Sequence, residues 1–362
     1  MKRRQFLAAI GAGTGAAVIA KPAIAQSSPE LKWRLASSFP KSLDTLYSSG
    51  ETLAKFVAEA TDNRFQIQNF AAGEIVPGLQ NLDAVQNGTV EMCHTAAYYF
   101  IGKDPTFALM CSVPFGPNAR QQNAWFYDGG GNQLVNDFVK KFNLYAMPGG
   151  NSGTQMGGWF RKEINTLDDL KGLKFRIGGW AGRTMQKLGA VPQQIAAGDI
   201  YPALEKGAID AAEWVGPYDD EKLGIQKVAK FYYYPGWWEG ATAQHFLINL
   251  GQWEALPNNY KAILTTAAAY ANSDVLARYD ARNPAALRKL VAGGTQLRAF
   301  SQPLMEVFLK TSNEVNAETA ATNPDFKKIY DNLMAFKNEE YLWWQIAEYS
   351  YDSFMIRSRA RG

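Results

Sequence analysis

Histidine and cysteine are scarce in this chain, and their scarcity excludes several kinds of active site. Among 362 residues the only histidines are His94 and His245, and the only cysteines are Cys93 and Cys111. The sequence has no HExxH segment, Cys/His cluster, EF-hand loop, Walker loop or GxSxG turn, which argues against the usual zinc, phosphoryl-transfer and serine-hydrolase sites. Cys93 and His94 are neighbours in a predicted strand and point to opposite faces, so they cannot form a nucleophile–base pair. A lyase that works with carboxylates alone is not excluded.

The chain also lacks a long apolar run beyond its N-terminus. Residues 1–25 have a basic start, a short apolar stretch and a small-x-small end at Ala23-Ile24-Ala25, which predicts a cleaved signal peptide. The pair Arg3-Arg4 followed by Phe6-Leu7 favours a twin-arginine signal, and a general secretory signal is the alternative. We therefore expect the protein in the periplasm. Disulfide formation is open there, but the apolar surroundings of both cysteines favour buried free thiols.

An excess of charge of one sign is missing as well. The formal net charge of +3 falls to −1 once Lys2, Arg3, Arg4 and Lys21 leave with the signal peptide. A nearly neutral mature chain predicts no nucleic acid partner and no anionic membrane surface as partner. Aromatic residues, in contrast, reach 13%, with 10 Trp and 17 Tyr. That content suits a protein that encloses a small molecule.

Apolar runs alternate with amphipathic segments, which predicts an α/β fold with a mainly parallel sheet. Strands are expected at 31–39, 65–70 and from 90 onward, with helices at 42–61 and 77–87 between them. A second series follows, with two strands joined by a Gly-rich connection near 144–162 and helices at 166–171, 182–188 and 199–206. We expect Asp199 to cap the last of these helices. From about residue 257 the chain is predicted to be mostly helical, with helices at 265–282, 301–322 and within 324–355.

Polar residues at the ends of apolar strands are the candidate ligand groups, because open α/β sheets bind ligands there. Arg176 lies in the apolar run LKFRIGG, where its guanidinium would suit a carboxylate, and a structural ion pair is the alternative. Asn151 and Gln155 lie in the Gly-rich connection, where ordinary turn chemistry also explains them. Glu239 follows the aromatic run YYYPGWW and could equally be a solvated loop acid. The segment AAEWVGPYDDEK places Glu213 and Trp214 at the end of a strand, where they are either structural or face a ligand.

These segments together resemble the solute receptors of tripartite ATP-independent periplasmic (TRAP) transporters. The resemblance covers essentially the whole mature chain and rests on WRLASSFP, AAGEIVPGLQNLDAVQNGTVEM, GGNSGTQMGGWFRKEINTLDDLKGLKFRIGG and GDIYPALEKGAIDAAEWVGPYDDEKLG. LKGLKFRI is its most specific part. EWVGPYDD and YYYPGWWEG are similar to the narrower branch that binds 2-oxo acids such as pyruvate, or 2-hydroxy acids such as lactate, with a metal ion.

The resemblance implies an α/β, two-lobed periplasmic binding protein (a Venus-flytrap fold) with mixed, mainly parallel sheets, hinge strands and long C-terminal helices. Residues 26–150 and about 241–295 would form the first lobe, residues 151–240 the core of the second, and residues 296–362 a C-terminal helical region. The lobes would close over a small organic acid, which the protein would deliver to a sodium-driven membrane permease. Relatives in this branch also imply a homodimer through the C-terminal helices.

The same resemblance assigns roles to the candidate residues. Arg176 would clamp the ligand carboxylate, and Asn151 would hydrogen-bond the ligand. The cation, sodium or calcium, would be held by Gln155, Glu213 and the Trp214 carbonyl, with Glu239 as a further ligand. An all-oxygen set of this kind suits these hard cations. Either Tyr98 or Tyr99, but only one of them, would face the pocket from a first-lobe strand.

Two other functions stay open at this point. The protein could be a lyase that acts on keto acids at the same metal site, although no histidine is placed to donate a proton. It could also be a sensory receptor that docks on a membrane kinase. Within the binding class, a single clear arginine favours a monocarboxylate, because a dicarboxylate would call for a second cationic clamp.

Overall fold

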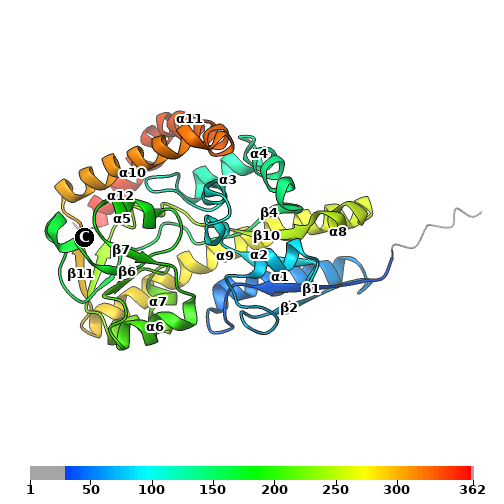
Figure 1. Cartoon of the computed structure of the whole chain (residues 1–362), viewed down its shortest axis with the longest axis horizontal. Coiled ribbons are helices and arrows are strands. Elements are labelled where there is room, and N and C mark those ends of the chain that lie inside the picture. Colours follow the sequence, from blue (N-terminus) through cyan, green and yellow to red (C-terminus); the bar gives the residue numbers. More distant parts are fainter. Residues whose placement is uncertain (1–28, 360–362) are drawn as a thin grey trace, which may run out of the picture.

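The computed structural model describes residues 29–359 and contains two β-sheets that lie side by side (Figure 1). The predicted signal peptide lies outside the described residues. The blue and cyan elements of the first sheet occupy one side of the molecule in Figure 1, and the green elements of the second sheet occupy the other. No helix within 29–359 is long and apolar enough to cross a membrane.

The first sheet has the strand order β2-β1-β3-β10-β4. β1 runs parallel to β2 and β3, whereas β10 runs antiparallel to β3 and β4. β10 comes nearly 100 residues after β4 in sequence, so the chain returns to this sheet after building most of the second. The strands are β1 (Leu31–Ser37), β2 (Phe65–Phe70), β3 (Met92–Thr95), β4 (Leu144–Asn151) and β10 (Ala243–Asn249).

The second sheet has the strand order β11-β9-β5-β8-β6-β7. It is also mixed: β6 runs parallel to β7 and β8, β11 runs parallel to β9, and β5 runs antiparallel to β8 and β9. The prediction of mixed, mainly parallel sheets is confirmed, and the antiparallel pairings are those of β10 and β5 with their neighbours. The strands are β5 (Gly158–Phe160), β6 (Lys174–Arg176), β7 (Val191–Gln193), β8 (Ala211–Ala212), β9 (Phe231–Tyr234) and β11 (Gln296–Ala299).

Helix α9 (Asn258–Ala292) connects the two halves along its 35 residues. It packs against α1 and β4 on the side of the first sheet and against α7 on the side of the second. Buried residues recur along its length from Tyr260 to Leu290, which explains why one helix can serve both cores. The sequence predicted only its central part, 265–282.

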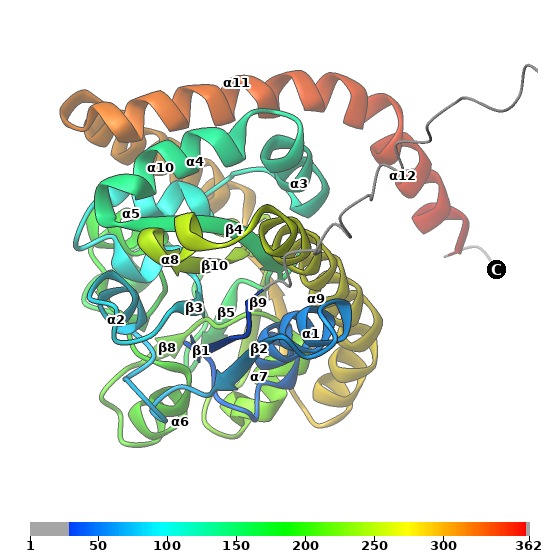
Figure 2. The same ribbon diagram turned by 90° about the vertical axis from the view of Figure 1, so that its right-hand side faces the viewer.

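The remaining helices cover the sheets. Along the N-terminal half lie α1 (Asp44–Ala60), α2 (Asn81–Gln86), α3 (Ala119–Tyr127) and α4 (Gly131–Val139). Beside the second sheet lie α5 (Ala181–Lys187), α6 (Ala197–Glu205) and α7 (Pro217–Leu223), whereas α8 (Leu250–Ala255) packs against β10 and β4 of the first sheet. The C-terminal helices are α10 (Gln302–Thr322), α11 (Pro324–Ile346) and α12 (Glu348–Arg359), of which α11 runs along the top of both views (Figures 1 and 2).

Two local predictions were wrong. Asp199 is not the cap of α6: the helix begins two residues earlier, at Ala197, and Asp199 lies in its first turn. The strand expected from residue 90 ends at Thr95, and the chain continues as the 3-10 helix η1 (Ala97–Phe100). A run of apolar residues does not distinguish a strand from a tight helical turn when both are buried. Tyr98 and Tyr99 therefore lie on a 3-10 helix and not on a strand.

Candidate functional site

Arg176 and Glu213 form a buried ion pair at the end of β6. Arg176 Nη1 donates to Glu213 Oε1 and to the Glu213 carbonyl oxygen, both at 2.5 Å, and Arg176 Nε donates to the Ile195 carbonyl at 3.1 Å. Both side chains of the pair are 1% exposed. The Trp214 ring lies 4.8 Å from the guanidinium carbon. The structural ion pair considered for Arg176 therefore exists, but it uses one nitrogen at the end of the guanidinium and leaves Nη2 toward the site.

Glu239 and Gln155 meet next to this pair through Thr242. Thr242 Oγ1 donates to Glu239 Oε2, and Gln155 Nε2 donates to Thr242 Oγ1 at 2.9 Å. The Gln155 backbone N–H also donates to the Glu239 carbonyl at 3.1 Å. Glu239 is only 2% exposed, so the solvated loop acid considered from the sequence is wrong. Trp237 and Trp238, directly before it, lie in the core of the second sheet, so the carboxylate follows buried residues.

The site buries two carboxylates, Glu213 and Glu239, beside one arginine, and the two carboxylates repel each other. Burial, and then the charge of Glu213, raises the pKa of Glu239 well above its usual value. Burial likewise raises the pKa of Glu213, and the nearby Arg176 opposes that rise. Buried like charges repel in a medium that screens them weakly. A bound cation would remove that repulsion.

Tyr98 and Tyr99 reach the site from the first sheet, and both are buried. Their exposed fractions are 4% and 8%, and their ring centroids lie 5.1 Å apart. The expectation that only one faces the pocket assumed the alternation of a strand, whereas these residues lie on the 3-10 helix η1. Glu239 acts on the Tyr98 hydroxyl and Arg176 on the Tyr99 hydroxyl, so both phenols lie within electrostatic reach of the site.

The two sheets are closed over the site by contacts around these tyrosines. Gln194 Nε2 donates to the Tyr99 carbonyl at 2.9 Å. The Tyr98 ring lies so near Gly179 that a Cβ at Gly179 would stand 2.5 Å from Tyr98 Cγ. Gly178 is almost as close to the same ring, and its N–H donates to Glu213 Oε1 at 2.6 Å. The glycine pair after β6 thus allows contact between the two halves.

The Asn151 side chain hydrogen-bonds to neighbouring protein groups beside the site. Its Oδ1 accepts from the Gly153 N–H at 2.9 Å, and its Nδ2 donates to Gln122 Oε1 at 2.8 Å. The Oδ1 bond lies within the turn after β4, and the Nδ2 bond ties that turn to α3. Asn151 therefore lies close to the site in sequence while its side chain contacts protein groups.

Three atoms test whether the site fits a cation and a carboxylate. Arg176 Nη2, Gln155 Oε1 and Glu213 Oε2 are buried and have no hydrogen-bond partner among residues 29–359. The first is a charged donor, which a carboxylate would satisfy. The other two are oxygen acceptors of the kind that sodium or calcium takes. Leaving such groups unpaired in a protein interior is costly, so the set fits a ligand that brings both an anion and a cation.

The site is unlike a transition-metal centre. No group of three or more His, Cys, Asp and Glu side chains able to hold a metal ion is found in the part of the chain that the structure describes. A cation here would combine Glu213, and Glu239 if it takes part, with amide and backbone oxygens. That composition matches the hard-ligand preference of sodium and calcium.

Sequence reasoning missed the residues that support the site. Thr242 joins Glu239 to Gln155, Gln122 fixes Asn151, and Asp219 and Asp220 are buried behind Trp214 on α7. The acidic pair in GPYDDEK follows a Gly-Pro turn and lies in the first turn of α7, a sequence position that gives no sign of burial. The pair is enclosed because α7 packs against α9 and because Tyr279 on α9 and Tyr232 on β9 donate to Asp219 and Asp220.

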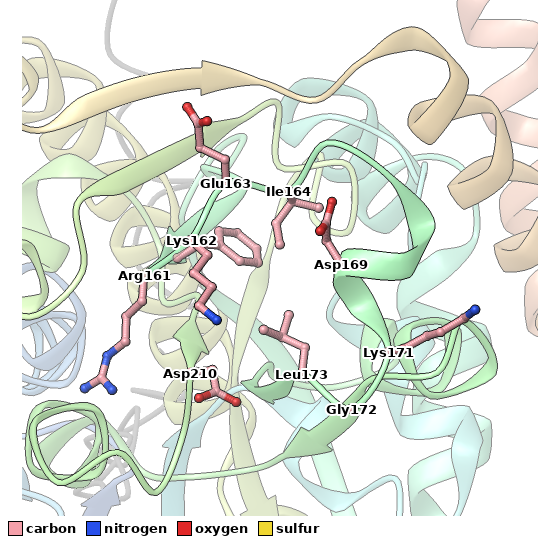
Figure 3. Close-up of a pocket in the computed structure, with 10 residues that line it drawn as sticks. Arg161, Lys162, Glu163, Ile164, Asp169, Lys171, Gly172, Leu173 and Asp210 are labelled. Carbon is pink, nitrogen blue, oxygen red and sulfur yellow. The ribbon is translucent and has the colours of Figure 1, made fainter.

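A separate surface cavity of about 370 Å³ lies beside β5 and β6 (Figure 3). Its charged side chains diverge: Arg161 and Lys171 point away from each other, and Glu163 points away from Asp210. Glu163 Oε1 accepts from Arg298 Nε, and Asp169 Oδ2 accepts from the Asn165 and Thr166 N–H groups. These acids are used within the protein, so the cavity does not compete with the buried site.

Comparison with known proteins identifies the family. The model of the DctP family (bacterial extracellular solute-binding protein, family 7) matches residues 36–323. The chain belongs to this family. Its members are solute-binding proteins and not enzymes, so the lyase interpretation loses its support.

Individual relatives agree with this assignment. The chain is 49% identical to a protein of Nostoc named as a monocarboxylate 2-oxoacid-binding periplasmic protein, over 99% of this chain and 100% of the relative. It is also 49% identical to a TRAP transporter solute-binding protein of Bordetella bronchiseptica, whose structure is described as a mixed-occupancy dimer with calcium and picolinate. The two structures superpose with a TM-score of 0.91, over 92% of this chain and 99% of that one. A TRAP solute-binding protein of Pseudoalteromonas atlantica with bound sodium and pyruvate is 38% identical, with a TM-score of 0.87 over 90% and 99% of the two chains. The fold is thus that of the TRAP periplasmic solute-binding proteins.

Proposed function

We propose that the protein is the periplasmic receptor of a TRAP transporter and that it binds a small 2-oxo monocarboxylate, such as pyruvate, together with sodium or calcium. The observation that carries the proposal is the buried set of unpaired atoms, one arginine nitrogen and two acceptor oxygens, in a single closed site. The names of the relatives support the same ligand class. A membrane permease is the partner that this function requires.

Each site residue has a role in this proposal. Arg176 Nη2 binds the ligand carboxylate, and Glu213 and Gln155 give oxygens to the cation. The Trp214 carbonyl and Glu239 complete the cation set. Tyr98 and Tyr99 close over the ligand from the first sheet, while Asn151 holds the turn that carries Gln155. The cation lets two carboxylates share a pocket with an anionic ligand.

The lobes follow from the same proposal. Residues 26–150 and about 241–295 form the first lobe and residues 151–240 the core of the second, while residues 296–362 form the C-terminal region. The pairing of β10 with β3 and β4 supports this division. Opening would separate Tyr98 and Tyr99 from the Gly178–Gly179 turn, as in hinge closure around a ligand.

Calorimetry on refolded, ligand-free protein tests the function. Pyruvate, 2-oxobutyrate, lactate and succinate are titrated with calcium, with sodium and with a chelator in sodium-free buffer. We expect tight binding of the 2-oxo monocarboxylates that needs one of the cations, and weak binding of succinate. Preference for lactate with calcium would favour the 2-hydroxy acid alternative. Equal binding with and without cations would refute the proposed metal role.

A homodimer through the C-terminal helices is the second part of the proposal. The end of α11 and α12 exposes apolar side chains that a single chain leaves uncovered, and Figure 2 shows α12 turning away from α11 at the edge of the molecule. Leu342, Trp343, Ile346 and Ile356 are 64%, 59%, 68% and 71% exposed. Exposed apolar groups of this extent mark interaction surfaces.

Sedimentation velocity tests the dimer. We expect the wild-type chain to sediment as a dimer and the double variant Ile346→Glu/Ile356→Glu as a monomer with unchanged pyruvate affinity. The matched control is Leu309→Glu, which places the same charge at an exposed apolar residue of α10. A wild-type monomer at all concentrations would refute this part.

A further inference from the structure

The Asp220 carboxylate, on the first turn of α7, accepts hydrogen bonds from three separate segments. Asp220 Oδ1 accepts from the Val215 backbone N–H at 3.2 Å. Asp220 Oδ2 accepts from Trp159 Nε1 at 2.9 Å and from the Tyr232 hydroxyl at 2.7 Å. The residue is 1% exposed and forms no ion pair in the described part of the chain. A buried carboxylate costs several kcal/mol unless its hydrogen bonds compensate, so an arrangement this complete calls for an explanation.

The two side-chain donors are held rigidly. Trp159 lies on β5 and Tyr232 on β9, which are paired strands of the second sheet. Their rings stack at a centroid distance of 3.9 Å and an interplanar angle of 16°. Because both donors are fixed by the sheet and by each other, the position of Asp220 is fixed by them.

The segment that Asp220 holds is the one that leads through the candidate site. β8 ends at Ala212, so Glu213, Trp214 and Val215 follow the strand without belonging to it. The Glu213 carbonyl accepts from Arg176 on one side, and the Val215 N–H donates to Asp220 on the other. Trp214 lies between these two anchors. The Trp214 ring lies 4.8 Å from the Arg176 guanidinium carbon, and the Val215 carbonyl accepts from the Met156 N–H at 3.0 Å, so Asp220 is the partner of the Val215 N–H, the group next to the Trp214 carbonyl.

We propose that Asp220 is a positioning residue for ligand binding: its carboxylate fixes the Val215 backbone and thereby aims the Trp214 carbonyl and ring at the cation and at Arg176. The inference rests on the proposed function, since it assumes that the Trp214 carbonyl contacts a cation. It adds a residue that touches neither ligand nor cation.

The chemistry of the three donors explains why an aspartate is needed. An asparagine has the same shape but one acceptor oxygen. If that oxygen faces Val215, the NH₂ group faces the Trp159 N–H; if it faces Trp159, the NH₂ group faces the Val215 N–H. Either orientation sets two donors against each other. Asp220→Asn therefore breaks the anchor with almost no change in volume.

The test measures calcium-dependent pyruvate binding to the full-length mature protein. We expect the dissociation constant to rise about 10- to 100-fold in Asp220→Asn, as for other residues that orient metal ligands. Calcium alone is titrated as a second readout, and its dissociation constant should rise in parallel. If Asp220 only stabilises the fold, Asp220→Asn will lower the melting temperature, and both dissociation constants, measured well below that temperature, will be unchanged.

Two tyrosine variants on β9 give a matched comparison that does not depend on Asp220→Asn folding. Tyr232→Phe removes a donor to Asp220, while Tyr233→Phe removes a buried hydroxyl that bonds the Ile164 backbone instead. We expect both to lose stability and only Tyr232→Phe to lose affinity. Equal affinities of wild type, Tyr232→Phe and Asp220→Asn would overturn the inference while the proposed function stands. Absence of binding by the wild type itself would overturn both.

Discussion

The two sheets bury polar groups in opposite ways. In the first sheet, His94 and His245 lie on the neighbouring strands β3 and β10 and are fully buried. Burial lowers the pKa of both to about 3, so they are neutral. In the second sheet, Arg176 and Glu213 are just as buried but form an ion pair, with Glu239 beside them. Neutral groups can serve packing alone, whereas buried charges are expensive and are expected where a function needs them.

Removing the buried arginine should give the largest effect. We expect Arg176→Ala to weaken pyruvate binding by roughly 1000-fold, since the charged donor to the ligand carboxylate is lost. It should also lower the free energy of unfolding by about 3–5 kcal/mol, because Glu213 is left buried without its partner. Calorimetry and chemical denaturation measure the two quantities. Unchanged affinity would show that Arg176 is only a structural ion pair.

A methyl group at the closure contact should give the next largest effect. Gly179 has φ of +60° and would place a Cβ against the Tyr98 ring, so Gly179→Ala should oppose closure. We expect affinity to fall about 10- to 100-fold, which corresponds to about 1.4–2.7 kcal/mol. Gly172→Ala is the control, because its φ of +71° imposes similar backbone strain with no atom within 4 Å of the new Cβ. Similar affinities of the two variants would mean that the Tyr98 contact does not limit closure.

Buried titratable groups beside the two sheets should make the free energy of unfolding depend on pH in opposite directions. The folded-state pKa of His245 lies below its ordinary 6.5, so the unfolded chain takes up the proton first and stability is lost as pH falls from 6.5 towards 3. Burial raises the pKa of Asp219 to about 7, so the folded state binds that proton first and stability is gained as pH falls from 7 towards 4. Each effect amounts to about 1.4 kcal/mol per pH unit within its window.

Denaturation of matched variants between pH 4 and 7 checks these opposite signs. Relative to wild type, His245→Gln should lose less stability on acidification, and Asp219→Asn should lose more. Parallel curves for all three proteins would show that neither group titrates with the expected shift.

An exposed ion pair of the first sheet should give the smallest effect. Arg34 on β1 bonds Glu91 at 2.7 Å, but the arginine side chain is 46% exposed. We expect Arg34→Ala to change the free energy of unfolding by less than about 1 kcal/mol and to leave pyruvate affinity unchanged. The same arginine-to-alanine change at residue 176 is its direct comparison. A large loss in Arg34→Ala would remove the contrast between the two sheets.

Several residues of the candidate site can be predicted from the sequence, because ligand groups lie at the ends of strands. Arg176, Glu213 and Trp214 follow apolar runs that read as strands, and the structure brings them together with Gln155 and Glu239. Tyr98 and Tyr99 were placed near the site but on the wrong element, since a buried apolar run fits both a strand and a 3-10 turn. Asp220 gave no signal, because its partners Trp159 and Tyr232 are distant in sequence.

The sequence by itself determined the alternation of strands and helices, the α/β class and the polar residues at strand ends, since these depend on local periodicity and residue chemistry. Only the tertiary structure decided which of those residues meet. The antiparallel entry of β10 and β5, the length of α9 and the closure of Tyr98 on Gly179 are long-range contacts. Their energies depend on packing between segments far apart in the chain, which no local pattern records.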